Sequence, residues 1–182
     1  MKKYLLGLFL ALSFYDTPIF AAQYSNSTTY QVVGNLTADS ANQAIIYIKL
    51  DAIATPTGSW GVNGISFRMN NTSNSMVKMA KIYYTNSATF NTSNLLDSIV
   101  NPGDTINFQF NLSNLGIISR YLFLTFDIDS NIACNTYYFD ASVIDSSLSI
   151  TGLGAGLYTP VDPNPSGNRI LPNPTLTPSL TI

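Results

Sequence analysis

Histidine and glutamate are both absent from this 182-residue chain, and all ten of its acidic residues are aspartate. Without histidine, the chain has no Ser-His or Cys-His catalytic pair and no histidine ligand for a metal ion. A glycosidase-type pair of carboxylates would need two aspartates that converge across the fold. The available aspartates are Asp51, Asp97, Asp127, Asp129 and Asp140. They stand mostly at strand ends and turns, which favours solvated positions, so we expect a protein that is not an enzyme and needs no cofactor.

Cysteine and charged residues are scarce as well. Cys134 is the single cysteine, so no intramolecular disulfide can form. We expect it to be a buried free thiol rather than a reactive or intermolecular one. Only 10% of the residues are charged and the net charge is −2. Such a surface has no basic patch for nucleic acid or anionic lipid, and we expect no nucleic-acid partner.

The first 21 residues have the pattern of a secretory signal peptide. Lys2 and Lys3 form a positive start, residues 4–15 are apolar, and Ala21 ends a segment suited to cleavage. The alternative is a membrane anchor, but a span needs about 20 apolar residues and Asp16 interrupts this run. We therefore expect export, to the medium or the cell surface, with no membrane span left after cleavage.

The remaining chain is organised around residues 121–129, a run of β-favouring residues. In an extended strand Leu122, Leu124, Phe126 and Ile128 point to one face, which is wholly apolar. The other face begins aromatic and ends acidic. This pattern predicts a central strand that is buried deeply at one end.

Several other segments alternate in the same way, namely residues 43–53, 62–69, 79–85, 105–112 and 136–144. About seven or eight such strands, joined by turns without crossover helices, predict an antiparallel β-sandwich of immunoglobulin or fibronectin type. A closed β-barrel is the alternative. We expect this single domain to cover residues 22–171 and a proline-rich tail to follow over residues 172–182.

Two polar segments are predicted to lie outside the strands. Residues 23–29 have the composition of a loose lead-in. Residues 86–94 form a polar loop, and we expect its one aromatic residue, Phe90, to anchor the loop in the core.

Exposed aromatic side chains are the first candidate binding site. Trp60, Tyr83 and Tyr137 stand in or beside predicted strands and could present rings on which a sugar stacks. Neighbouring asparagines would supply hydrogen bonds. The competing interpretation is ordinary packing, because a doublet such as Tyr83-Tyr84 must place one ring on each face of a strand.

A calcium-like spacing is the second candidate. Asp127, Asp129 and Asn131 place oxygen ligands at the first, third and fifth positions of a loop. Ile132 stands where such a loop needs glycine, and Tyr138 where it needs an acid. The end of a strand followed by a polar turn therefore fits better, and no metal is expected.

A resemblance to a known family rests on five stretches of sequence: residues 41–46, residues 80–85, Phe90, residues 121–129 and residues 135–142. With this pattern the chain resembles the β-sandwich domain that precedes the BNR-repeat neuraminidase module in secreted proteins of Bacteroidetes-type bacteria. The resemblance implies an accessory, non-catalytic module of an exported protein. It does not extend to sialidase activity, because the chain has no Ser-x-Asp-x-Gly-x-x-Trp box. Cys134 replaces the glycine expected before Asn135.

These features together predict a secreted, non-catalytic β-sandwich that acts as a binding or scaffolding module at the cell surface. A glycan or another cell-surface protein would be its partner. Two alternatives stay open: a carbohydrate-binding module that uses exposed aromatic rings, and a pilin-like or adhesin-like structural subunit that exchanges strands between copies.

Overall fold

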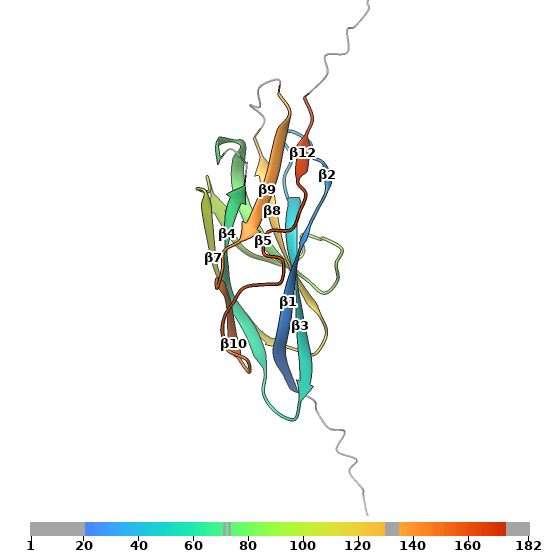
Figure 1. Cartoon of the computed structure of the whole chain (residues 1–182), viewed down its shortest axis with the longest axis vertical. Helices are drawn as coiled ribbons and strands as arrows, with labels where there is room; N and C mark the ends of the chain where they lie inside the picture. Colours follow the sequence, from blue (N-terminus) through green and yellow to red (C-terminus); the bar gives the residue numbers. More distant parts are fainter. Residues whose placement is uncertain (1–20, 71, 73, 130–134, 174–182) are drawn as a thin grey trace, which may run out of the picture.

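The computed structural model describes residues 21–70, 72, 74–129 and 135–173. These residues form twelve β-strands and one short 3-10 turn, η1 (Asn74–Met76). The strands build two sheets that pack face to face in an elongated molecule (Figure 1). Within the described ranges, no helix is long and apolar enough to cross a membrane.

The first sheet has five antiparallel strands, and its middle strand is the one predicted to be central. In order across the sheet they are β1 (Ala21–Gln31), β3 (Gln43–Thr55), β8 (Arg120–Ile128), β5 (Val77–Thr85) and β6 (Leu95–Val100). β8 therefore has a hydrogen-bonded neighbour on each side. This position confirms the prediction made from its unbroken run of β-favouring residues.

The second sheet has seven strands. Its order is β11 (Gly156–Tyr158), β10 (Leu148–Gly152), β4 (Trp60–Asn70), β9 (Tyr137–Val143), β12 (Arg169–Leu171) and β2 (Gly34–Asn35), and β7 (Thr105–Leu115) pairs with β4. The first half of β4 pairs with β10 and its second half with β9. The short pair β12–β2 is parallel. The two sheets remain separate, so the fold is a β-sandwich and the barrel alternative is wrong.

The core lies between the sheets and follows the predicted period of two. Leu122, Leu124 and Phe126 of β8 are fully buried on its inner face. In the second sheet, Phe67 of β4 meets Phe108 of the neighbouring strand β7, with ring centroids 6.0 Å apart at 73°. An edge-to-face arrangement of this kind adds to the stability that burial of the rings supplies.

Arg169 fastens the short strand β2 to the rest of the molecule. Its guanidinium donates to the carbonyl oxygens of Ala44 at 2.7 Å, Asn35 at 2.7 Å and Gly34 at 3.2 Å. Burial lowers the pKa of Arg169 from its usual range. A two-residue strand forms few backbone hydrogen bonds. The side chain of Arg169 therefore supplies hydrogen bonds to three backbone carbonyl groups in and near β2.

Strand β1 is the main departure from the predicted elements, since residues 23–29 belong to it. Its inward positions include Ser27 and Thr29, which are 1% and 2% exposed. Polar residues at buried positions hide the alternation on which the prediction depends. The segment is extended because it pairs with β3 on one side, and on the other the N–H of Thr29 donates to Val161 O at 3.0 Å.

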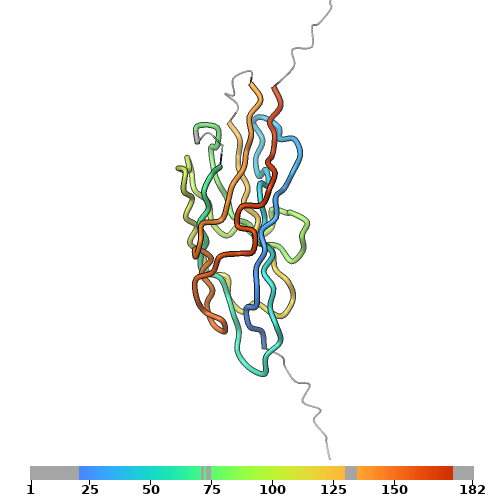
Figure 2. Tube along the Cα trace, viewed as in Figure 1, coloured from blue at the N-terminus to red at the C-terminus, as the bar shows by residue number. Residues whose placement is uncertain are grey.

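The described chain enters and leaves the molecule at opposite poles. Strand β1 begins near one end of the long axis, and β12 ends near the other (Figure 2). The first and last described strands thus end at opposite poles of the sandwich.

Replacement of a core side chain on β8 tests the packing described above. Leu124→Ala should lower the free energy of unfolding by about 2–5 kcal/mol, because it removes a fully buried side chain and leaves a cavity. Val33→Ala, at a position that is 69% exposed, should change it by about 0.5 kcal/mol or less. Chemical denaturation of both variants measures the difference. Equal effects would contradict the assigned core.

Candidate functional site

The outer face of the first sheet carries a row of aromatic side chains, one from each of four adjacent strands. We call Tyr30, Tyr47, Phe123 and Tyr83 the outer aromatic row; they come from β1, β3, β8 and β5. Each lies directly opposite the next in the strand register. Aromatic pairs at such cross-strand positions stabilise a sheet and define its register.

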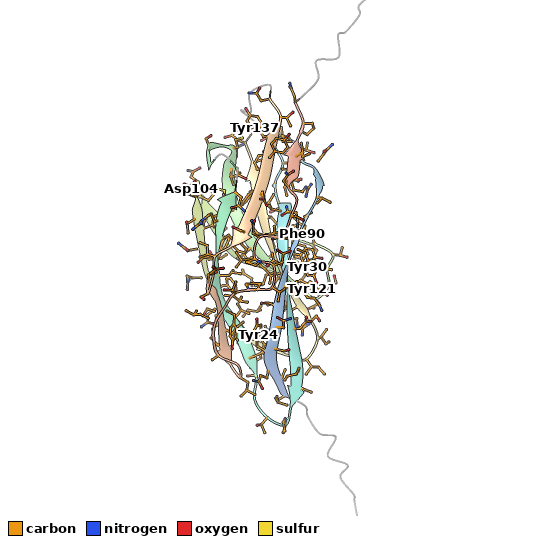
Figure 3. All side chains as sticks on the ribbon, in the orientation of Figure 1. Tyr24, Tyr30, Phe90, Asp104, Tyr121 and Tyr137 are labelled. Carbon is orange, nitrogen blue, oxygen red and sulfur yellow. The ribbon has the colours of Figure 1, made fainter. Side chains whose placement is uncertain are left out.

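The row is open at one end and closed at the other. The ring of Tyr30 stacks on Tyr47 at 4.9 Å and 15°, and Tyr47 stacks on Phe123 at 5.0 Å and 28°. Tyr30 is 39% exposed, whereas Phe123 and Tyr83 are 2% and 4% exposed. The buried end is covered by Phe90, which lies 5.4 Å from each of these two rings. Figure 3 shows Tyr30, Phe90 and Tyr121 gathered near the middle of the molecule.

The position of Phe90 corrects the prediction that it enters the core. Phe123 and Tyr83 alternate with the core residues Leu124 and Ile82, so they point away from the space between the sheets. Phe90 packs on this outer surface instead. The prediction failed because a sandwich has two faces on each sheet, and a loop can anchor on either one.

A polar group borders the open end of the row. Lys49 Nζ lies 2.9 Å from Asp51 Oδ1, and Ser119 Oγ donates to the same carboxylate at 2.6 Å. Burial alone would raise the pKa of Asp51, but the hydrogen bonds from Ser119 and Lys49 outweigh it and hold the pKa below its usual range. Burial raises the pKa of Tyr47, and the nearby phenols of Tyr30 and Tyr121 raise it further. Tyr47 thus keeps its hydroxyl proton at neutral pH.

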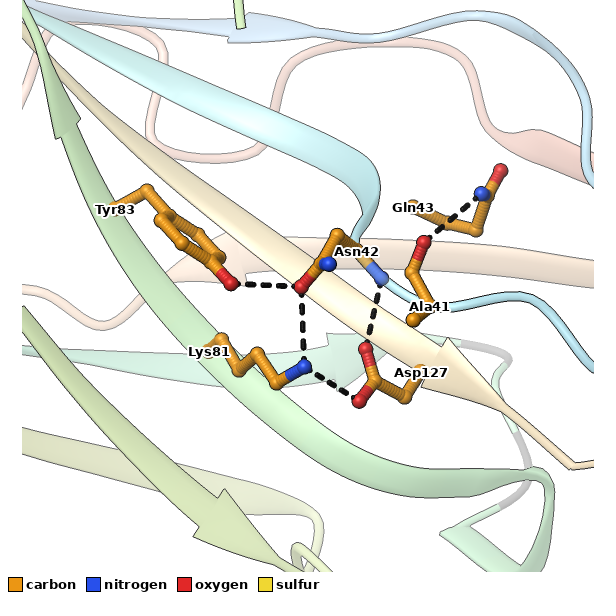
Figure 4. Close-up of polar contacts among 6 residues, drawn as sticks. All are labelled: Ala41, Asn42, Gln43, Lys81, Tyr83 and Asp127. Atoms are coloured by element: carbon orange, nitrogen blue, oxygen red, sulfur yellow. Dashed lines mark hydrogen bonds and ion pairs between the residues drawn. The ribbon is translucent and has the colours of Figure 1, made fainter. Parts of the chain in front are cut away.

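A second polar group, the Lys81 cluster, closes the buried end (Figure 4). It consists of Asn42, Lys81, Tyr83 and Asp127. Lys81 Nζ lies 2.6 Å from Asp127 Oδ2 and donates to Asn42 Oδ1 at 3.0 Å. The Tyr83 hydroxyl donates to the same amide oxygen at 2.7 Å, and the Asn42 N–H donates to Asp127 Oδ1 at 2.7 Å. Burial raises the pKa of Tyr83, so this phenol remains a hydrogen-bond donor.

The outer face of the second sheet has a polar hollow of about 450 Å³. Its polar lining is Arg68, Asn70, Ser142, Asp145 and Asn164. Nearby, burial raises the pKa of Asp140, although hydrogen bonds from the Ala141 N–H and the Asn70 amide act in the opposite direction. No aromatic ring lines this hollow, so it offers hydrogen bonds without a stacking surface.

The three aromatic residues predicted as a platform do not form one. Trp60 is 1% exposed, packs 5.8 Å from the ring of Tyr24, and donates from Nε1 to Gly116 O at 3.3 Å. It is a core residue, and the prediction that it is exposed is wrong. Tyr83 is buried in the outer aromatic row on β5, whereas Tyr137 lies on β9 of the other sheet, partly buried against the core. For Trp60, a single ring beside a turn, the local sequence does not show which face the ring occupies.

The calcium-like spacing has lysine partners in the structure. Asp127 is held by Lys81 and by the N–H of Asn42, and Asp129 lies 3.8 Å from Lys78 Nζ. Asn131 and Cys134 lie outside the described residues. Among the residues that the structure describes, no three histidine, cysteine, aspartate or glutamate side chains group as a metal site.

Sequence reasoning missed Tyr30, Tyr47, Asn42 and Lys81. It singled out Tyr83 and Asp127, but for an aromatic platform and a calcium-like loop rather than for one cluster. A usable signal was present in the three core strands, where Tyr47, Phe123 and Tyr83 all occupy positions opposite the apolar face. Aromatic residues at outward positions of three strands indicate a second buried surface, because an ordinary solvated face carries polar residues there.

Two packed, open sheets with one shared core define the class of this protein as a β-sandwich. No protein-family model matches the chain, and no curated protein is similar to it in sequence. Function is therefore inferred from the geometry of the two outer faces.

The polar group at the open end predicts a pH dependence. Because the folded-state pKa of Asp51 lies below its unfolded value, its contribution to stability is present above about pH 3.9 and is lost as the pH falls through the folded-state pKa. Asp51→Asn should therefore be less stable than the unchanged protein near neutral pH, and the difference should shrink in acid. Thermal unfolding over a pH series measures it.

Ser119→Ala serves as a second variant, since it keeps the carboxylate and removes one of its donors. It should show part of the same pH-dependent loss. A difference that stays constant with pH would contradict the role assigned to these hydrogen bonds.

Proposed function

We propose that this chain is an exported, non-catalytic β-sandwich module that binds or supports another component of the bacterial cell surface through its outer aromatic row. The observation that carries the proposal is the open end of that row. Tyr30 is 39% exposed on an edge strand, and Tyr47 is half-buried beside it. Aromatic rings that are partly open to solvent on an otherwise polar surface are typical of recognition sites.

The surroundings of Tyr30 support binding rather than packing alone. Phe90 covers the buried end of the row, so packing alone explains why Phe123 and Tyr83 are aromatic. Tyr30 and Tyr47 stack on one another, and the partly exposed Lys49–Asp51 pair lies on the same face. Rigid stacked rings lose little conformational entropy when a partner binds.

A glycan is the partner that these groups favour. Sugar rings stack on aromatic side chains, and their hydroxyls bind amide, carboxylate and hydroxyl groups. Tyr30 supplies an exposed ring at the edge of the sheet, and Lys49, Asp51 and Ser119 supply polar groups within the same face. The resemblance to an accessory domain of carbohydrate-related exported proteins agrees with this choice.

Binding should depend on Tyr30. Tyr30→Ala should weaken attachment of labelled protein to cells of the producing organism, and to any positive spot of a glycan array, by about tenfold or more. Tyr138→Ala is the matched control, because Tyr138 is also an exposed tyrosine, at 50%, but lies on β9 of the other sheet. It should bind as the unchanged protein does.

Equal loss in both variants, or in neither, would contradict the assigned face. If no glycan on the array binds the protein but attachment to cells still depends on Tyr30, the partner is a surface protein and not a glycan. Turnover of a glycoside or ester that disappears when one aspartate is mutated would overturn the non-catalytic proposal.

A polymerising subunit is the second candidate function, and strand β6 is the feature that favours it. β6 ends the first sheet, and its Leu95 and Val100 are 50% and 62% exposed. An exposed apolar edge strand can accept a strand from another copy. The opposite edge of this sheet is less open, because β1 already exchanges backbone hydrogen bonds with Val161.

Electron microscopy of the purified protein separates these two functions. Dispersed single particles are expected for the binding module. Filaments that disappear in Val100→Lys, which places a charge on the β6 edge, would favour the polymerising subunit instead.

A further inference from the structure

The Lys81 cluster brings an amine, a carboxamide and a carboxylate together from three separate parts of the chain. Lys81 lies on β5, Asp127 on β8, and Asn42 immediately before β3 (Figure 4). Lys81 Nζ is 3.0 Å from Asn42 Oδ1, and the carbonyl carbon is one bond further, about 1.2 Å from that oxygen. The amine is thus held beside the carboxamide group, within hydrogen-bond distance of its oxygen.

We propose that Lys81 and Asn42 condense to form an intramolecular isopeptide bond, with Asp127 as the acid–base group. Asp127 accepts a proton from the Lys81 ammonium, and the neutral amine then attacks the carbonyl carbon of the Asn42 side chain. A new C–N bond joins Nζ to this carbon, and the bond to Nδ2 breaks as Asp127 returns a proton to the departing nitrogen. The attacking nitrogen gives its extra proton to the released ammonia, which leaves as ammonium with the positive charge that Lys81 held. Asp127 is again a carboxylate, and no oxidation or reduction takes place.

The remaining contacts of the cluster fit this reaction. The Tyr83 hydroxyl donates to Asn42 Oδ1 at 2.7 Å, at the oxygen on which negative charge develops during attack. The N–H of Asn42 donates to Asp127 Oδ1 at 2.7 Å. That hydrogen bond holds the carboxylate so that its second oxygen, Oδ2, stays 2.6 Å from Lys81 Nζ.

The residues beneath the Lys81 cluster are buried, and the cluster itself has little exposure to solvent. Thr125, which lies opposite Lys81 in the strand register, is fully buried, and Tyr83 is 4% exposed under Phe90. The side chains of Lys81 and Asp127 are 14% and 18% exposed. Limited contact with water favours transfer of the proton within the ion pair, and the small opening lets ammonia leave.

The bond would cross the central strand of the first sheet. In the order β3–β8–β5, Asn42 immediately precedes β3 and Lys81 lies on β5, so the two residues come from either side of β8. The link would therefore join the two neighbours of β8 across that strand. The Lys49–Asp51 pair on the same face offers a contrast, because both residues lie on β3 and, within the described chain, Lys49 has no carboxamide partner.

The mass of the exported protein tests the proposal directly. The unchanged protein should weigh about 17 Da less than its sequence requires, the mass of one ammonia. Lys81→Met and Asp127→Asn should each have the full sequence mass. Lys49→Met, the matched control, should keep the loss. After trypsin digestion, tandem mass spectrometry should find one branched peptide that joins the segment ending at Lys49 to the segment starting at Met79.

An unchanged protein with the full sequence mass would overturn the proposal, and this measurement does not depend on the folding of any variant. A mass loss that persists in Lys81→Met would also overturn it, because it would show a succinimide at Asn42, which loses the same ammonia without lysine. Either result would leave the outer aromatic row and its binding function unaffected.

Discussion

Burial of both faces of β8 is the constraint on which the rest of the structure depends. Leu122, Leu124 and Phe126 are sealed by the second sheet, and Phe123 and Thr125 are equally inaccessible on the opposite face. A sandwich normally covers only one side of each sheet and leaves the other to water. This sheet therefore needs a second cover, which the loop bearing Phe90 and the neighbouring tyrosines supply.

The asymmetry of that second cover sets apart the two regions for which functions are proposed above. Phe90 covers the row where β8 meets β5, and the lysine, carboxamide and carboxylate lie at this end with little exposure to water. On the β1 side the sheet ends, and the rings of Tyr30 and Tyr47 are covered only by one another and by neighbouring side chains. One surface thus offers a site suited to chemistry within the chain at one end and a site suited to recognition at the other.

The sequence reveals those parts of the fold in which side chains alternate, and little else. Strands β4, β7 and β8 could be predicted because their apolar residues recur at a period of two. The first part of β1 could not, since Ser27 and Thr29 occupy inward positions. The burial of Trp60 could not be predicted either, because a single aromatic residue beside a turn is not part of an alternating pattern.

The contact between Asn42 and Lys81 depends on something that no local pattern contains. The two residues are 39 positions apart, and the register of β3 and β5 on the intervening β8 brings them together. That register includes a bulge between Ala44 and Ile46. A shift of one residue would turn Lys81 to the opposite face and dissolve the cluster, so its geometry can only be read from the assembled sheet.

The placement of the chain ends at opposite poles has a mechanical consequence. Tension applied along the long axis would pull β1 past β3, and β12 past β9, parallel to the strands themselves. Every hydrogen bond of a ladder loaded in shear must yield together, whereas a ladder pulled from one end opens one bond at a time. A pull on the two ends of the described chain would thus load its terminal strands in shear.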